Sequence, residues 1–357
     1  MTSLADVIGK GRKQKHVDSA SISVFSNIPE QVYTQPEHVI ATVVPKFDAN
    51  DPEMVKYLAE HGYVVVSQVL QPEETAIAVE MFWQFLSDCG GMLPNDPTSW
   101  TDDNFKRVGS KSSGIIGRAG FGNSDAQWFI RTRTPVKTVF AHVHGDADLI
   151  ASFDGGNVFR PWHGDAAFAS LGVAPLSACT SSGWFHVDQG RLQRGPGVRC
   201  VQGLVSLTDC SGATGGFCCI PGSQHSHDDL VALARDDGNY FQVPASFPQL
   251  SRPQILPVCS AGDMILWDSR TIHCSTPALD PPSTPVNRLL RMASYQCMTP
   301  RRWASDDVVA TRMQAYKHRL TTTHWPHLAD YSVAPLDPDP RVLSSAPDNV
   351  RALVGSV

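Results

Sequence analysis

The chain has 357 residues, a net charge of -6 and no strongly basic stretch, which argues against a protein built mainly to bind nucleic acid or an anionic membrane surface. Hydrophobic residues make up 42% of the chain and charged residues 18%, as in a soluble globular protein with a substantial core. No apolar stretch is long enough to cross a membrane, so we expect neither nucleic acid nor a membrane as a partner.

The two ends of the chain are expected to flank one domain. Residues 1–50 are polar and lack clear periodicity until about residue 39, which predicts an N-terminal arm. The first residues lack the apolar segment of a secretory signal, and the C-terminal Gly355-Ser356-Val357 is not a Ser-Lys-Leu peroxisomal signal. Nine cysteines, an odd number in a chain too large to need disulfides, indicate reduced thiols. We therefore expect a cytoplasmic protein.

The first helix and strand signals lie between residues 51 and 90. Asp51-Pro52-Glu53 predicts the start of a helix, because acidic residues suit the positive end of the helix dipole. His61-Gly62 predicts a turn into a strand over residues 63–66. Gln71-Pro72-Glu73-Glu74 predicts the start of a second helix, whose apolar residues at helical spacing are expected in the core.

Residues 91–153 are harder to interpret. Residues 91–135 are rich in Gly, Ser, Asp and Asn, which predicts a lid or a substrate loop. Within this loop Arg131 would either meet an anionic group of a substrate or form a salt bridge. Residues 136–153 predict a helix that packs outside the core.

The following strands carry two histidines and an aspartate. In the strand-like run 184–188, His186 and Asp188 are two positions apart and point to the same side. His273 ends a second strand-like run over residues 262–273. Two imidazoles and one carboxylate are the ligand set that holds non-haem Fe(II) on one face and leaves the opposite face open. The three residues therefore predict an iron site.

A second His-x-Asp motif, His163-Gly164-Asp165, competes with this interpretation. It follows Arg160-Pro161-Trp162, and the residues after it are small and typical of a loop. We interpret the motif as lining the entrance to the site, which makes His163 a candidate pocket residue, or as a purely structural loop.

Two arginines lie beyond the last histidine. Arg288 and Arg291 follow a long, proline-rich loop, and Arg291 opens the strand-like run 291–297. A fixed cation at this place is what a dicarboxylate co-substrate needs. We favour Arg291 because it leads directly into the strand, and Arg288 stays the alternative.

The strands and turns between the two histidine motifs resemble a known family. A strand over residues 201–209 ends in Leu-Thr-Asp, a glycine turn follows at 214–216, and the chain then reads Pro221-Gly222-Ser223-Gln224-His225. These features closely resemble the phytanoyl-CoA dioxygenase-like family of Fe(II)/2-oxoglutarate oxygenases, in which a Pro-Gly-Ser-His signature follows such a turn. In this chain Gln224 stands where that histidine is usual.

The resemblance covers roughly residues 55–300, is strongest over 184–300, and implies a fold. That fold is mainly β with flanking α-helices, around a double-stranded β-helix (jelly-roll, cupin-like) core at about residues 154–300. We therefore expect a single oxygenase domain over residues 51–330, between the arm and a C-terminal tail over residues 331–357.

The resemblance also implies roles for individual residues. The three iron ligands of the family match His186, Asp188 and His273. The arginine that pairs with the distal carboxylate of 2-oxoglutarate matches Arg291, and a hydroxyl that contacts the same co-substrate matches Ser275. Gln202, on an inward strand, is a candidate for a second polar contact.

The implied reaction uses Fe(II), O2 and 2-oxoglutarate, releases succinate and CO2, and hydroxylates or otherwise oxidises a C–H bond of a small or medium-sized organic metabolite. Because halogenating relatives replace the carboxylate ligand with a small residue, Asp188 favours hydroxylation, while desaturation, epoxidation and ring formation stay open. The candidate pocket residues are Trp184, Trp267, His163 and Arg131. The sequence predicts neither the substrate nor the oligomeric state.

Two other classes of protein remain compatible with the sequence. One is a metal-dependent β-helix enzyme that works without 2-oxoglutarate, which is favoured if neither arginine faces the pocket. The other is a non-catalytic metal-binding module of the same fold, against which the complete His/Asp/His set argues. The further histidines, which are expected in solvated loops or as packing and capping residues, are His225, His227, His324 and His327.

Overall fold

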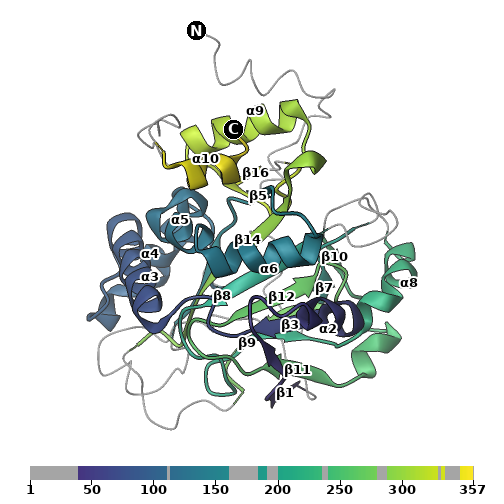
Figure 1. Ribbon diagram of the computed structural model, residues 1–357. Coiled ribbons are helices and arrows are strands. Elements are labelled where there is room, and N and C mark those ends of the chain that lie inside the picture. Colours follow the sequence, from purple (N-terminus) through teal and green to yellow (C-terminus); the bar gives the residue numbers. More distant parts are fainter. Residues whose placement is uncertain are drawn as a thin grey trace.

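The computed structural model describes residues 39–110, 113–160, 184–190, 200–234, 240–279, 288–328, 331–333 and 346–356. Two β-sheets form the centre of the molecule, and helices surround them (Figure 1). This arrangement confirms the predicted mainly β fold with a jelly-roll core and flanking helices. Within the described residues, no helix is long and apolar enough to span a bilayer.

The larger sheet contains the longest strand of the fold, β14. Within the described residues its strand order is β2-β3-β12-β8-β14-β6-β4, and β5 pairs with the end of β14. Its strands are β2 (Lys46–Phe47), β3 (Tyr63–Val66), β4 (Ile115–Ile116), β5 (Leu149–Ala151), β6 (Gly156–Phe159), β8 (Val201–Ser206), β12 (Met264–Asp268) and β14 (Arg291–Pro300). All of its pairings are antiparallel except β2 with β3.

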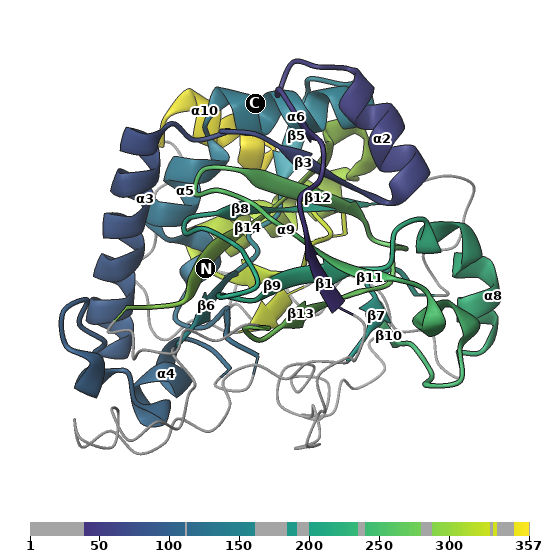
Figure 2. The same cartoon turned by 90° about the horizontal axis from the view of Figure 1, so that it is seen from below.

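The smaller sheet lies against the larger one and has the order β1-β11-β9-β13-β7-β10 in the part of the chain that the structure describes (Figure 2). Its strands are β1 (Val39–Thr42), β7 (His186–Val187), β9 (Gly216–Cys219), β10 (Phe241–Gln242), β11 (Gln254–Pro257) and β13 (His273–Thr276). A separate antiparallel pair joins β15 (Thr321–Thr322) to β16 (Tyr331–Val333). The first described residues thus supply edge strands to both sheets.

Apolar side chains fill the space between the two sheets. Because successive residues of a strand point to opposite faces, every second residue of β3, β8 and β12 faces this interior. The interior cluster includes Tyr63, Val65, Leu204, Phe217, Cys219, Leu256, Ile265, Trp267 and Ala293. Burying each large apolar side chain contributes roughly 1.5–3 kcal/mol, which holds the sheets face to face.

Helices cover the outer face of the larger sheet. These helices are α2 (Glu53–His61), α3 (Pro72–Phe85), α4 (Asp102–Val108), α5 (Asp125–Arg131) and α6 (Thr134–His144). The alternate residues of the sheet, such as Val64, Val205 and Leu266, pack in one cluster with Phe82 of α3 and Phe140 of α6. The predicted starts of α2 and α3 are confirmed, and Gln71 and Glu74 form a capping box at α3.

The prediction of a lid or loop over residues 91–135 is wrong, because α4 and α5 lie there. Thr101 accepts a hydrogen bond from the Asn104 amide, and Ser124 accepts one from the Gln127 amide. The polar residues of this segment therefore act as helix N-caps. The predicted helix over residues 136–153 is correct only in its first part. It ends at Gly145, whose φ of 59° is left-handed, and the chain then enters β5.

A shorter helix, α8 (His227–Ala232), covers the outer face of the smaller sheet. His225 is exposed, as predicted, but His227 is buried, and its Nε2 lies 2.7 Å from the carbonyl oxygen of Gln189. The solvated position predicted for His227 is therefore wrong, because the residue opens a helix that packs inward. The short helical turns of the fold are Leu86–Gly90, Pro97–Ser99, Phe121–Asn123, Ser223–Ser226, Pro248–Ser251 and Arg301–Trp303.

The C-terminal region joins the fold through α9 (Asp306–Lys317) and α10 (Asp348–Val354), which lie together at one end of the molecule (Figure 1). Arg312 of α9 is fully buried and donates hydrogen bonds to the carbonyl oxygens of Ala151, Pro326, Leu353 and Val354. One guanidinium thus ties β5, α9 and α10 together. The division into arm, domain and tail stays a prediction, and residues 1–38 of the arm lie outside the described residues.

Replacing this guanidinium should destabilise the fold strongly. In Arg312→Ala four buried carbonyl groups lose a charged donor, and we expect the free energy of unfolding to fall by about 3 kcal/mol or more. Arg302→Ala is the matched control, because Arg302 pairs with Asp146 at the surface, where an ion pair contributes about 0–1 kcal/mol. Urea unfolding followed by circular dichroism measures both variants, and equal losses would contradict this role of Arg312.

Candidate metal centre

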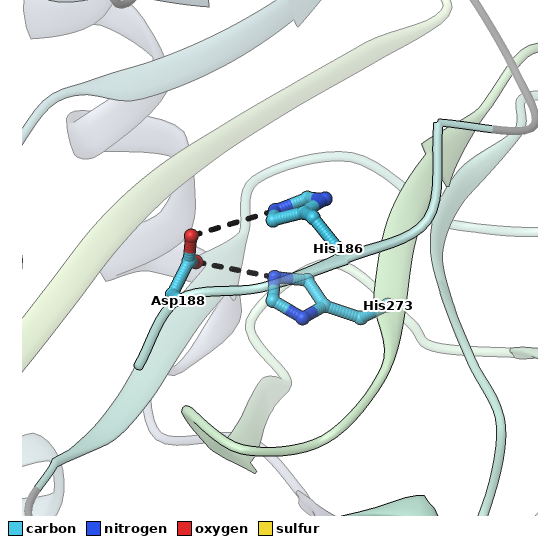
Figure 3. A group of neighbouring side chains, drawn as sticks. All are labelled: His186, Asp188 and His273. Atoms are coloured by element: carbon cyan, nitrogen blue, oxygen red, sulfur yellow. Dashed lines mark ion pairs between the residues drawn. The ribbon is translucent and has the colours of Figure 1, made fainter. Parts of the chain in front are cut away.

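Two neighbouring strands bring the predicted iron ligands together. His186 of β7 and His273 of β13 are directly opposed in an antiparallel pair, although they lie far apart in the sequence. Asp188 follows β7, and its backbone N–H donates to the carbonyl of Ser269 at 2.9 Å. The three side chains converge on one point, with the carboxylate facing both rings (Figure 3).

The distances suit a single ion. His186 Nε2 lies 3.5 Å from Asp188 Oδ1, and His273 Nε2 lies 3.3 Å from Asp188 Oδ2. One potential ligand atom from each of the three residues lies within 4.8 Å of the others. Among the described residues this is the one group of three or more His, Cys, Asp or Glu side chains that is compact enough for a metal ion.

Backbone carbonyl groups set the orientation of both imidazoles. His186 Nδ1 lies 3.1 Å from the carbonyl oxygen of Trp184, and His273 Nδ1 lies 2.9 Å from that of Thr271. A carbonyl oxygen only accepts, so each Nδ1 carries the proton. In a neutral ring, Nε2 then directs its lone pair toward the Asp188 carboxylate, which has lone pairs of its own. Such a convergence of acceptors fits a cation between them.

The charge states of the residues support the same conclusion. Burial, and next the charge of His273, lower the pKa of His186 to about 3, so this ring is neutral near pH 7. Burial alone would raise the pKa of Asp188, but the attraction of His186 and His273 outweighs it and holds this pKa below its usual range. Near neutral pH the site therefore offers a neutral imidazole and a carboxylate anion, the forms that bind metal.

Aromatic side chains hold the two imidazoles in place. The Trp184 ring stacks on His186 with a centroid distance of 4.3 Å and an interplanar angle of 6°, and the Tyr240 ring lies 4.9 Å away. His273 contacts the rings of Phe217 and Trp267. The predicted pocket residues Trp184 and Trp267 are thus beside the metal site, and both are largely buried.

Two further side chains contact Asp188. Gln202 of β8 donates from Nε2 to Asp188 Oδ2 at 2.9 Å, so its amide group is directed at the metal ligand. A contact of Gln202 with 2-oxoglutarate stays a prediction. His324 donates from Nε2 to the backbone carbonyl of Asp188 at 3.0 Å. The sequence did not predict that His324 lies at this site, because no local pattern shows that the chain after β15 reaches the metal centre.

Arg291 is buried, and no acidic residue among those that the structure describes pairs with it. Only 1% of its surface is exposed, its guanidinium lies 5.0 Å from the Phe159 ring centroid, and Nη1 is 3.4 Å from Asn157 Oδ1. Its Nε has no hydrogen-bond partner in the described part of the chain. Arg288, the alternative, is exposed. A buried guanidinium with an unused donor fits a carboxylate ligand, because an unpaired buried charge is costly.

A thiol and a hydroxyl group accompany this cation. A Cβ built on Gly216 of β9 would collide with Cys210 Sγ and would lie 3.8 Å from Arg291 Nε, so the glycine lets the Cys210 thiol pack close to the guanidinium. Ser275 is two residues after His273 in the same strand, and the two side chains therefore share a face. Its side chain keeps some exposed surface among buried neighbours.

Two further residues, Arg131 and His163, were predicted to line the pocket. Arg131 is fully buried at the end of α5, donates to the carbonyl of Gly122 at 3.1 Å and lies 4.6 Å from the Trp128 ring centroid. These contacts favour a structural role, and contact with a substrate stays a prediction. His163 and its His-Gly-Asp motif lie outside the described residues.

Comparisons with known proteins agree with the geometry. Residues 151–279 match the sequence model of the phytanoyl-CoA dioxygenase family, which confirms the predicted resemblance. A curated relative, Ava biosynthesis cluster protein O of Aspergillus versicolor, is 24% identical over 291 residues, which cover 74% of this chain and 83% of the relative.

Solved structures align with this chain at low sequence identity, and one of them has a TM-score above 0.5. GlcNAc Inducible Gene 2 of Candida albicans aligns with a TM-score of 0.55 and 12% identity, over 88% of this chain and 79% of that protein. The non-haem α-ketoglutarate-dependent carbocyclase SnoK from nogalamycin biosynthesis aligns with a TM-score of 0.47 and 16% identity, over 72% of this chain and 88% of that protein.

Removing one imidazole should abolish tight metal binding. In His273→Ala we expect the affinity for Co(II), a coloured stand-in for Fe(II), to fall by about 100-fold or more, because a ligand is lost outright. The exposed His225→Ala is the matched control and should bind as the wild type does. Titration monitored by the visible Co(II) absorption measures both affinities. An unchanged affinity in His273→Ala would contradict the assignment of His273 as a metal ligand.

Proposed function

We propose that this protein, an iron- and 2-oxoglutarate-dependent oxygenase of the phytanoyl-CoA dioxygenase-like family, hydroxylates a C–H bond of a small or medium-sized organic metabolite. The observation that carries the proposal is the pairing of a compact His/Asp/His group with a buried arginine that lacks an acidic partner among the described residues. The His/Asp/His group suits a metal ion, and the buried arginine suits a carboxylate of a dicarboxylate co-substrate.

Each residue has a distinct part in the proposed site. His186, Asp188 and His273 would hold Fe(II) through two imidazole nitrogens and a carboxylate oxygen. Arg291 pairs with the distal carboxylate of 2-oxoglutarate, and Ser275 donates a hydrogen bond to the same co-substrate.

The bound iron, with 2-oxoglutarate and O2, supplies the oxidising chemistry, in which the co-substrate becomes succinate and CO2. The protein contributes orientation and exclusion of water. The carbonyl groups of Trp184 and Thr271 fix the two rings, and Gln202 and His324 fix Asp188 from the side chain and the backbone. The apolar interior limits the access of water to the reacting groups.

The type of metabolite follows from the relatives only in outline. The Aspergillus versicolor relative is named for a biosynthesis cluster, which supports a secondary-metabolite-like substrate. The carboxylate ligand Asp188 favours hydroxylation over halogenation, because a halide would need its position on the iron. A metal enzyme that works without 2-oxoglutarate is disfavoured, because the described residues offer no acidic side chain that would pair with the charge of Arg291.

The arginine assignment is testable against its alternative. Under anaerobic conditions, 2-oxoglutarate added to the Fe(II)-loaded protein should produce a weak visible charge-transfer band. Arg291→Gln should raise the dissociation constant of 2-oxoglutarate by about 30-fold or more, because a buried charge pair is lost. Arg288→Gln should leave it unchanged, since Arg288 is exposed. If Arg288→Gln is the damaged variant, the assignment is reversed.

The carboxylate ligand offers an independent test. Asp188→Ala should lose the charge-transfer band and the slow release of succinate in air, because the iron loses its anionic ligand. Circular dichroism should still show a folded protein, since the strands around Asp188 do not depend on its side chain. Succinate release at the wild-type rate in this variant would rule out the proposed centre.

A further inference from the structure

One carboxylate near the metal centre has no part in the site described above. Asp154 lies between β5 and β6, and its Oδ1 accepts a hydrogen bond from the backbone N–H of Gly155 at 2.6 Å. Its own carbonyl accepts from Gln127 Nε2 at 2.8 Å. Among the described residues, no Lys, Arg or His forms an ion pair with the Asp154 carboxylate. The backbone of Asp154 is thus firmly held, while its charge has no direct partner.

Backbone contacts place this carboxylate at the same end of the barrel as the metal centre. Phe153, the preceding residue, donates its N–H to Thr322 Oγ1 and accepts from the Thr322 N–H, both at 2.9 Å. Two residues after Thr322, the His324 ring donates to the carbonyl of Asp188 at 3.0 Å. The segment that carries His324 therefore bridges Asp154 and the ligand Asp188.

The electrostatic surroundings agree with this placement. Burial raises the pKa of Asp154, His324 acts in the opposite direction, and the negative charge of Asp188 raises it further. Arg131 also lowers this pKa, but by less than Asp188 raises it. The two carboxylates therefore lie close enough to repel each other, and His324 attracts the charge of Asp154 more strongly than Asp188 repels it.

Three side chains of this region keep exposed surface. Asp154 and Tyr295 are only partly buried although the residues directly before and after them are buried, and the Asp188 side chain keeps 17% of its surface exposed. The charge of Asp154 also acts on Tyr295: burial chiefly raises the pKa of Tyr295 to about 12, and the Asp154 charge contributes to this rise. All three side chains are therefore accessible in part from outside the core.

The charges of the proposed loaded site cancel without Asp154. The two positive charges of Fe(II) and the one of Arg291 balance Asp188 and the dianion 2-oxoglutarate. Asp154 adds a further negative charge, which His324 and Arg131 attract without forming an ion pair with it among the described residues. A substrate that brings one positive charge would give this carboxylate a direct partner.

We propose that Asp154 anchors the substrate by pairing with a protonated amine, so that this oxygenase acts on a basic, nitrogen-containing metabolite. The inference rests on the proposed function, because it places the amine beside an iron and 2-oxoglutarate centre. Asp154 is a specificity-determining residue, and the iron ligands and Arg291 do not depend on it.

The test uses the Fe(II)- and 2-oxoglutarate-loaded full-length protein under anaerobic conditions. The probes are phenethylamine and its neutral counterpart N-acetylphenethylamine, titrated while the charge-transfer band is monitored for a shift. We expect the wild type to bind the amine at least about 10-fold more tightly than the acetylated compound, which corresponds to a partly buried ion pair. Asp154→Asn should reduce this preference to about one.

Further variants separate charge from structure. Asp154→Glu keeps the charge and should keep a preference for the amine, while Asp154→Ser, a second removal, should lose it. The surface variant Asp148→Asn is the matched control and should behave as the wild type, because Asp148 is exposed. If Asp154→Asn does not fold, Asp154→Ser and Asp154→Glu decide the question between them.

The outcomes distinguish this inference from the proposed function. If the loaded wild type shows no charge-transfer band, the proposed function fails. If the band forms but the wild type binds both probes equally, or if the preference for the amine survives in Asp154→Asn, Asp154 serves only the turn before β6 and the inference is overturned.

Discussion

The cross-strand pair of His186 and His273 is the constraint on which the rest of the site depends. It sets two imidazoles side by side on the inner face of the smaller sheet, and Asp188, directly after β7, lies in front of both rings. Each ring is fixed through Nδ1 by a carbonyl two residues earlier in the chain, just before its strand. The geometry of the metal centre is therefore a property of strand pairing and of the backbone on either side of the strands.

The sequence predicted this centre because period-two spacing is a local signal. His186 and Asp188 are two positions apart in a strand-like run, and the Leu-Thr-Asp and Pro-Gly-Ser features indicated the family resemblance in which His273 and Arg291 match functional positions. The burial of Arg291 and the exposure of Arg288 agree with the favoured choice between the two arginines, although their roles stay predictions. The mainly β fold with its helical cover is confirmed for the same reason.

What the sequence could not predict depends on contacts between distant segments. His324 reaches Asp188 only because β15 lies beside Phe153, and no local pattern records that pairing. Residues 91–135 read as a loop because they are rich in Gly, Ser, Asp and Asn, although Thr101 and Ser124 act as helix N-caps in the fold. The sequence offers no reason to single out Asp154, since the charges that surround it come from distant segments that only the fold brings together.

The same cross-strand pair determines when, during folding, a molecule can bind its metal ion. Because the two histidines come from distant parts of the chain, their meeting requires the closure of a long loop, which is a slow, late event in the folding of a β-barrel. An unfolded chain therefore has no preformed site, and iron is captured only by molecules whose barrel has closed. Metal content then reports the fraction of correctly assembled protein, and the bound ion in turn retards unfolding by selective stabilisation of the native state.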